Sequence, residues 1–280
     1  MKNFARIGVL SAAVLFTSSA FAQQVELPRP SPNAKLSQFL GVTEVGVEYS
    51  CPGVKNRKIW GGVVPYDKVW RAGANAPTKL TFSKDVVVDG KPVAAGSYTF
   101  LIIPTATKWT LILNRDPKGV GVFGYNKADD VLRVEVKPQP SPMRERLAYL
   151  FANEGDDGGT LELEWEKLRV SLPIKVHTAE QVATSIKGLE NGGWSPWANA
   201  ARYQLEHKNI DDGMTLIEKS LSIKETWNNL FVKAQLLAAK GNYKEALPLA
   251  QKAKELGEKD ENFFGKDEVE AALKAWKSKS

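Results

Sequence analysis

The residue types with the greatest chemical potential gather in one segment, residues 49–78. It places aromatic rings beside a guanidinium, a carboxylate and an amide. Aromatic faces can stack on a sugar or a peptide, and a guanidinium can bind a carboxylate through two parallel hydrogen bonds. The segment therefore predicts a ligand site. Its candidate residues are Tyr49, Trp60, Tyr66, Asp67, Trp70, Arg71 and Asn75.

The same segment also has a purely structural interpretation. Trp60 and Trp70 could close one end of a folded domain, while Arg71 and Asn75 bond the carbonyls of a long loop. An enzyme that used this loop would need Asp67 in an apolar pocket, where desolvation raises the pKa of a carboxyl. No G-x-x-x-x-G-K pattern occurs, so we expect no nucleotide. The sequence leaves both interpretations open.

Catalytic and metal-binding groups are scarce elsewhere. The chain has one Cys and two His, and it contains no G-x-S-x-G nucleophile elbow. We therefore predict no catalytic residue, no metal and no cofactor. The alternating carboxylates Glu162, Glu164 and Glu166 are typical of a solvated sheet face, and Asp156 is typical of a hairpin turn. We expect Cys51 to be buried.

The elements around the aromatic segment are predicted to be strands. From Thr43 to about Val176 apolar residues recur at every second position, and Gly- and Asp-containing turns separate the runs. This period predicts about nine short antiparallel strands in a sandwich or a barrel-like closure. The expected strands are residues 43–49, 80–82, 85–89, 97–103, 111–113, 131–137, 147–153, 161–165 and 168–176.

After His177 the period becomes helical. We expect one helix to start at Thr178 and to end at Asn191–Gly193, and a second to start with Ser195 as its N-cap. Residues 197–220 align with residues 230–253 at an offset of 33. The alanines of the second copy, with Gly241 and Tyr243, resemble the tetratricopeptide repeat, and residues 266–277 would cap the array.

The first residues of the chain suggest export, and its charge bears on the class of partner. Residues 1–22 combine a basic start, a short apolar run and Ala20-Phe21-Ala22, which predicts a signal peptide cleaved after Ala22. Removing it takes away two of 38 basic residues and leaves 32 acidic ones, a net charge of +4. That charge balance does not favour binding to nucleic acid. We expect a periplasmic or secreted protein with no membrane span.

A series of motifs that includes the aromatic segment resembles the sequence of a known family. It runs from Tyr49 to Gly61 and from Val64 to Asn75, and it continues through Ala95-Gly96-Ser97-Tyr98 and Asp130–Val134. Over residues 28–176 it resembles the secreted bacterial family called domain of unknown function 2911. The resemblance implies an exported β-rich protein, often with helical repeats appended, and no established activity. Cys51 replaces the family's usual Arg and Asn56 its usual Gly, which argues against a cation or a positive φ there.

Together these patterns predict an α+β multidomain chain: an antiparallel β-sandwich followed by an α-helical, tetratricopeptide-like repeat tail. The expected domains are the signal peptide (1–22), the sandwich (23–177) and the tail (178–280). We expect a non-catalytic binding or scaffold protein of the cell envelope. Its tail would bind an envelope protein or peptide, and the sandwich loop a small ligand or glycan. The alternative is an enzyme that acts on an envelope carbohydrate or peptide through the 49–78 loop.

Overall fold

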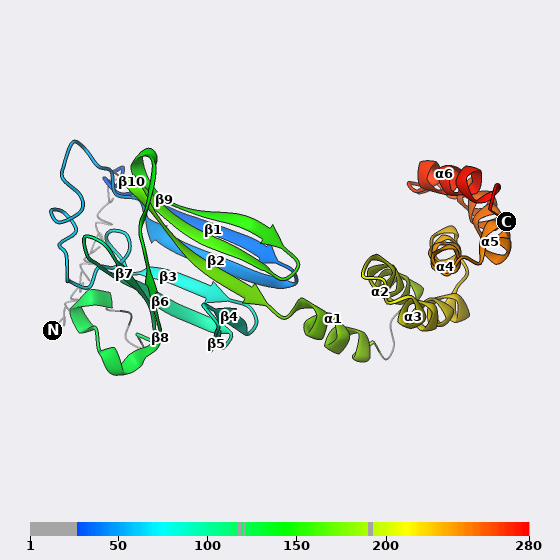
Figure 1. Ribbon diagram of the computed structural model, residues 1–280, viewed down its shortest axis with the longest axis horizontal. Helices are drawn as coiled ribbons and strands as arrows, with labels where there is room; N and C mark the ends of the chain where they lie inside the picture. The colour runs from blue at the N-terminus through cyan, green and yellow to red at the C-terminus, as the bar shows by residue number, and fades with distance from the viewer. Residues whose placement is uncertain (1–26, 117–118, 120, 190–192, 280) are drawn as a thin grey trace, which may run out of the picture.

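The computed structural model describes residues 27–116, 119, 121–189 and 193–279 (Figure 1). The predicted signal peptide and its cleavage site lie outside these residues. Within them, the chain forms strands up to Val176 and α-helices from Thr178 onward. Figure 1 shows helix α1 leaving the strands directly from the end of β10, with the other helices beyond it. The α+β class and the helical tail are confirmed.

Two antiparallel sheets make the sandwich. The larger sheet has six strands in the order β1-β2-β3-β6-β7-β8. Each strand pairs with its neighbour in an antiparallel register, for example Val47 opposite Leu80 and Leu111 opposite Val134. The bounds are β1 Asn33–Leu40, β2 Thr43–Ser50, β3 Thr78–Phe82, β6 Gly96–Pro104, β7 Trp109–Asn114 and β8 Asp130–Val136.

The smaller sheet has the order β5-β4-β10-β9. Its strands are β4 Val86–Val88, β5 Lys91–Val93, β9 Gln139–Gly155 and β10 Gly158–Val176. The two ends of β10 lie side by side, because the Val176 amide donates to the Asp157 carbonyl at 3.0 Å. The chain therefore reverses direction near Glu166, where φ is +56°. The two expected strands at 161–165 and 168–176 are the two arms of this one strand.

The sandwich core follows from the period-two pattern. Alternate residues of each strand point between the sheets, and Val45, Val47, Leu80 and Leu163 are each at most 2% exposed. Two strands were not predicted. β1 is an edge strand whose alternation is weak, since only Leu40 is fully buried, and β5 is only three residues long. Short or exposed strands carry little periodic signal.

Six α-helices form the rest of the described chain. They are α1 Thr178–Lys187, α2 Trp194–Glu206, α3 Ile210–Ile223, α4 Trp227–Ala239, α5 Tyr243–Gly257 and α6 Lys266–Trp276. Two predicted helix boundaries were wrong. α1 ends at Lys187, with Gly188 as its C-cap, and α2 has Gly193 as its N-cap, so Ser195 lies inside the helix. Gly241, with a φ of +82°, follows the C-cap of α4.

Small residues let the helices approach one another closely. Ala201 of α2 and Ala234 of α4 are both fully buried, as are Ala246, Ala250 and Ala253 of α5. At Gly213 of α3, an added Cβ would lie 2.7 Å from Leu236 and 3.3 Å from the Ala201 carbonyl. The alanines aligned at the 33-residue offset therefore occupy the helix contacts, which is how a repeat array packs.

Polar contacts join the first helices to the sandwich. The Thr43 hydroxyl donates to Gln181 of α1 at 3.0 Å, and the Thr178 hydroxyl donates to the Asp156 carbonyl. His207, just after α2, lies 3.5 Å from the Asp156 carboxylate. The hairpin turn between β9 and β10 therefore contacts both α1 and the end of α2.

Candidate functional site

Trp60 belongs to a cluster of four tryptophans at one end of the sandwich. It is 8% exposed, and its ring centre lies 4.4 Å from that of Trp109 and 5.8 Å from those of Trp70 and Trp165. Its indole N–H has no hydrogen-bond partner among the described residues. The rings of Trp70 and Trp165 are each nearly perpendicular to that of Trp60 and pack against it edge to face.

Trp70 is half-buried and is fixed by its backbone. Its amide donates to the Ile102 carbonyl at 2.7 Å, and the Ile102 amide donates back at 2.9 Å, beyond the point where β3 begins. Its indole N–H donates to the Gly73 carbonyl at 3.0 Å. The loop thus continues the sheet and carries both tryptophans against the core. This arrangement is the structural alternative that the sequence left open.

Arg71 and Asn75 bond loop carbonyls. The Arg71 guanidinium donates to the Asn75 carbonyl, and the Asn75 amide donates to the Ser31 carbonyl at 3.0 Å. The guanidinium carbon also lies 5.3 Å from the ring centre of Phe123. Phe123 is 85% exposed, so this cation–π contact faces solvent. Arg71 is half-buried and Asn75 is exposed.

The remaining candidates divide between packing and solvent. Tyr49 is half-buried, its ring centre lies 4.7 Å from that of Tyr149, and its hydroxyl accepts from the Tyr149 amide. Burial raises the pKa of Tyr49. Tyr66 is half-buried and packs close to Gly61. Asp67 is exposed, so it lies outside the apolar pocket that an acid–base role would need.

Cys51 follows Ser50, the last residue of β2, and is half-buried rather than fully buried. Burial raises the pKa of its thiol. This effect is larger than that of the hydrogen bond from the Tyr49 hydroxyl and of the charge of Arg146, both of which lower the pKa. The thiol is therefore less ionised at neutral pH than an exposed cysteine. A thiol that holds its proton is a weak nucleophile.

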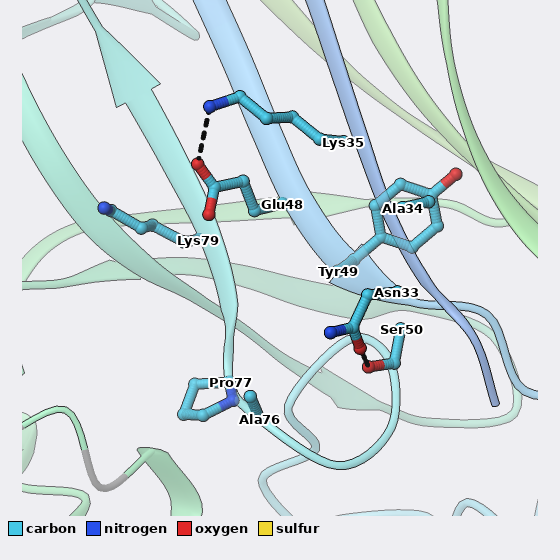
Figure 2. A pocket seen from close by; sticks show the side chains of 9 residues that line it. All are labelled: Asn33, Ala34, Lys35, Glu48, Tyr49, Ser50, Ala76, Pro77 and Lys79. Atoms are coloured by element: carbon cyan, nitrogen blue, oxygen red, sulfur yellow. Dashed lines mark hydrogen bonds and ion pairs between the residues drawn. The ribbon is translucent and has the colours of Figure 1, made fainter. Parts of the chain in front are cut away.

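A hollow of about 340 Å³ opens beside the two ends of this segment (Figure 2). Three strands contribute its polar side chains, with Asn33 and Lys35 from β1, Glu48 from β2 and Lys79 from β3. The Ser50 hydroxyl donates to the Asn33 side-chain oxygen at 2.8 Å. Figure 2 shows the Asn33 amide nitrogen pointing away from Ser50. This hollow was not predictable from the sequence, because its polar residues lie on separate strands.

Charges in this hollow are only partly paired. The Lys35 ammonium lies 3.0 Å from the Glu48 carboxylate. The hydrogen bond and charge of Lys35 lower the pKa of Glu48, and the charge of Lys79 adds to the effect. Figure 2 shows the Lys79 ammonium apart from that carboxylate.

Comparison with known proteins identifies the family. The model of the family described as a protein of unknown function, DUF2911, matches residues 31–174, which is more than half of the chain. The chain belongs to the DUF2911 family. No curated protein and no solved structure matches it.

One DUF2911 position corrects an expectation from the sequence. Asn56 has a φ of +55°, and the neighbouring Lys55 a φ of +49°. Asparagine tolerates this left-handed conformation better than most residues do. Our expectation that this position lacks a positive φ was wrong.

The carboxylates of β10 in the DUF2911 domain also differ from expectation. Glu162 and Glu164 are only 8% and 6% exposed, so they do not lie on a solvated face. Arg144 Nε lies 2.7 Å from Glu164, and Arg169 Nε lies 2.9 Å from its other carboxylate oxygen. Arg169 also reaches Glu162 at 3.2 Å. The fold-back of β10 covers these carboxylates, and no local pattern signals that fold-back.

Two kinds of feature are absent from the described residues of this DUF2911 protein. No helix there has both the length and the apolar character to cross a bilayer. No group of three or more His, Cys, Asp or Glu side chains there is placed to hold a metal ion.

Proposed function

We propose that this chain is an exported binding protein of the cell envelope, and that its helices α2–α6 bind a protein partner. The leader-like residues 1–22 support export to the periplasm or beyond. The proposed domains are that leader, the DUF2911 sandwich to residue 177 and the helical tail from residue 178.

Helix α4 provides the observation that carries this proposal. Asn228 and Gln235 are seven residues apart, so they share one face of the helix, and both are half-buried. The side-chain oxygen of Gln235 is buried and has no hydrogen-bond partner among the described residues. A buried acceptor without a donor costs about 1–3 kcal/mol. A donor from a bound partner would remove that cost.

The aromatic loop gives no support to catalysis. Trp60 and Trp70 pack against the core, and Asp67 is exposed. The enzyme hypothesis relied on Asp67 having an apolar environment, so it gains no support from this geometry. Helix α4 is the better place to test function.

Site-specific crosslinking tests the proposal in intact cells. The full chain would carry a photo-crosslinking residue at position 228 or, as a control, at the exposed position 255 of α5. We expect one recurring protein adduct from position 228 only. A Gln235→Met change in the same chain keeps the size of the side chain and removes the acceptor, and it should reduce the adduct about tenfold.

Two results would contradict the proposal. One is an equal set of adducts from positions 228 and 255, which would indicate random collision. The other is a recurring adduct that Gln235→Met leaves unchanged, which would remove the buried acceptor from the interface. Circular dichroism of each variant checks that the helices remain folded.

A further inference from the structure

The hollow in Figure 2 adjoins a second hollow on the six-stranded sheet. This second hollow, of about 240 Å³, shares Lys35, Glu48 and Lys79 with it. The second hollow is lined further by Ser37, Glu44, Gly46, Thr81, Ser83 and Ser97. The two therefore form one groove across strands β1, β2, β3 and β6, which we name the sheet groove.

The strand register explains the shape of the sheet groove. Ser37 lies opposite Gly46, Gly46 opposite Thr81, and Thr81 opposite Ser97, so short side chains form one row across four strands. Three strand spacings make this row about 14 Å long. Longer side chains border it on both sides. One border is the row Lys35, Glu48, Lys79, and the other begins with Phe39 opposite Glu44.

The chemistry of the floor favours hydroxyl-bearing ligands. The Thr81 and Ser97 hydroxyls lie 3.1 Å apart, and each hydroxyl can both donate and accept. The backbone groups of β2 and β3 are used in the sheet, because each pairs with a strand on both sides. An extended peptide lying on this face would find no free backbone ladder, whereas a sugar needs only side-chain partners.

The borders add an aromatic surface and a charge. Phe39 is 61% exposed at one end of its row, where a ring can cover the apolar face of a sugar. At the other border, Lys35 is paired with Glu48, while Lys79 has no hydrogen bond or ion pair among the described residues. Glu44 lies four residues from Glu48 along β2, which is about 13 Å away. An anionic group of a ligand therefore fits at the Lys79 end.

We propose that the sheet groove binds an oligosaccharide that carries a carboxylate. The ligand's carboxylate pairs with the Lys79 ammonium, and its hydroxyls bond the Ser37, Thr81 and Ser97 side chains. This site meets the aromatic segment only at its two ends, and no residue of helix α4 lines it. It goes beyond the proposed protein partner, and it stands or falls independently of that partner.

Titration with defined oligosaccharides tests the proposal on the full chain. The probe is trigalacturonate, and its fully methyl-esterified form is the matched control, since esterification keeps the hydroxyls and removes the charge. We expect amide NMR shifts at Gly46 and Thr81 with trigalacturonate, and binding about tenfold weaker for the ester. Lys79→Gln should weaken trigalacturonate binding by a similar factor, while Lys175→Gln on the other sheet should not.

A second variant tests the groove without changing a charge. Thr81→Leu raises the centre of the floor, so it should weaken both the acid and the ester about tenfold while the circular dichroism spectrum stays unchanged. Equal binding by wild type and Thr81→Leu would overturn the groove assignment. Binding of a triglutamate peptide as tight as that of trigalacturonate would overturn the sugar assignment, because it would show a general anion surface. Absence of shifts at Gly46 and Thr81 would overturn the proposal outright.

Discussion

The side-chain amide of Asn229 donates to the hydroxyl of Ser220 at 3.0 Å, at a point where both residues are fully buried. The same amide also donates to the Lys224 carbonyl at 2.7 Å, and the Ser220 hydroxyl donates to the Trp194 carbonyl at 2.8 Å. The Asn229 oxygen accepts from the Thr226 amide at 2.9 Å and completes a capping box. One polar side chain of α4 thus links α3, the α3–α4 connection and, through Ser220, the start of α2.

Replacing Asn229 should destabilise the helical tail. Asn229→Ala leaves the Lys224 carbonyl and the Thr226 amide without these partners, and unsatisfied buried groups cost about 1–3 kcal/mol each. We expect the free energy of unfolding of the tail to fall by about 3 kcal/mol, measured by urea denaturation followed by far-ultraviolet circular dichroism. The control is Asn228→Ala, one residue away and half-buried, which should cost less than about 1 kcal/mol. Equal losses would show that the network adds nothing.

Trp70→Ala separates packing from ligand contact. The Trp70 ring centre lies 5.8 Å from that of Trp60 and 6.0 Å from that of Trp165, so removal of the ring leaves a cavity in the tryptophan cluster. We expect a loss of about 3 kcal/mol in sandwich stability, measured by thermal melting. Phe123→Ala is the matched control, since that ring is 85% exposed and should cost little. A small effect of Trp70→Ala would instead favour a ligand platform.

Removal of Arg169 tests the buried carboxylates. Its guanidinium lies 2.9 Å from Glu164 and 3.2 Å from Glu162, while about a third of the Arg169 side chain is exposed. Arg169→Met should therefore cost about 2 kcal/mol, less than the loss of a fully buried pair, because solvent screens the remaining charges. Lys175→Met, also on β10, is the control, since Lys175 is exposed. A loss no larger than that of Lys175→Met would contradict a stabilising role for these ion pairs.

The alternation of apolar residues predicted most of the sandwich, because a strand with one face on the core must alternate apolar with polar residues. That reasoning failed where burial does not alternate. β1 exposes most of its residues, so its sequence carries no strong period. Glu162 and Glu164 do alternate with apolar residues, but arginines from β9 and from the second arm of β10 cover them. The fold-back that brings Arg169 to Glu164 depends on a single positive φ at Glu166.

The candidate site was predictable only where it is continuous in sequence. The aromatic segment stands out because its unusual residues follow one another. The structure places Trp60 in the core and Trp70 against it, while Asp67 and Asn75 are exposed. The sheet groove depends instead on the register of four strands. Ser37 and Ser97 are sixty residues apart, and nothing in either neighbourhood places them in one row. Register is a property of the folded sheet, so such a site becomes visible only in the structure.

The reactivity of Cys51 should depend on pH. Only the thiolate reacts with iodoacetamide, and burial raises the pKa of this thiol. The folded state holds the proton more tightly than the unfolded chain does. The resulting stability is fully present below the unfolded pKa, about 8.5 for cysteine, and is lost as the pH rises through the folded pKa. The midpoint of alkylation rate against pH should therefore lie above that of the same protein in urea.

Tyr49→Phe provides the sharper test of this relationship. The Tyr49 hydroxyl lowers the pKa of Cys51 through a hydrogen bond, so its removal should move the alkylation midpoint further upward. A change in access alone would alter the plateau rate at high pH and leave the midpoint unchanged, which separates the two causes. A midpoint that falls in Tyr49→Phe would show that the hydroxyl does not stabilise the thiolate. A wild-type midpoint at or below the value in urea would contradict burial as the dominant influence on this thiol.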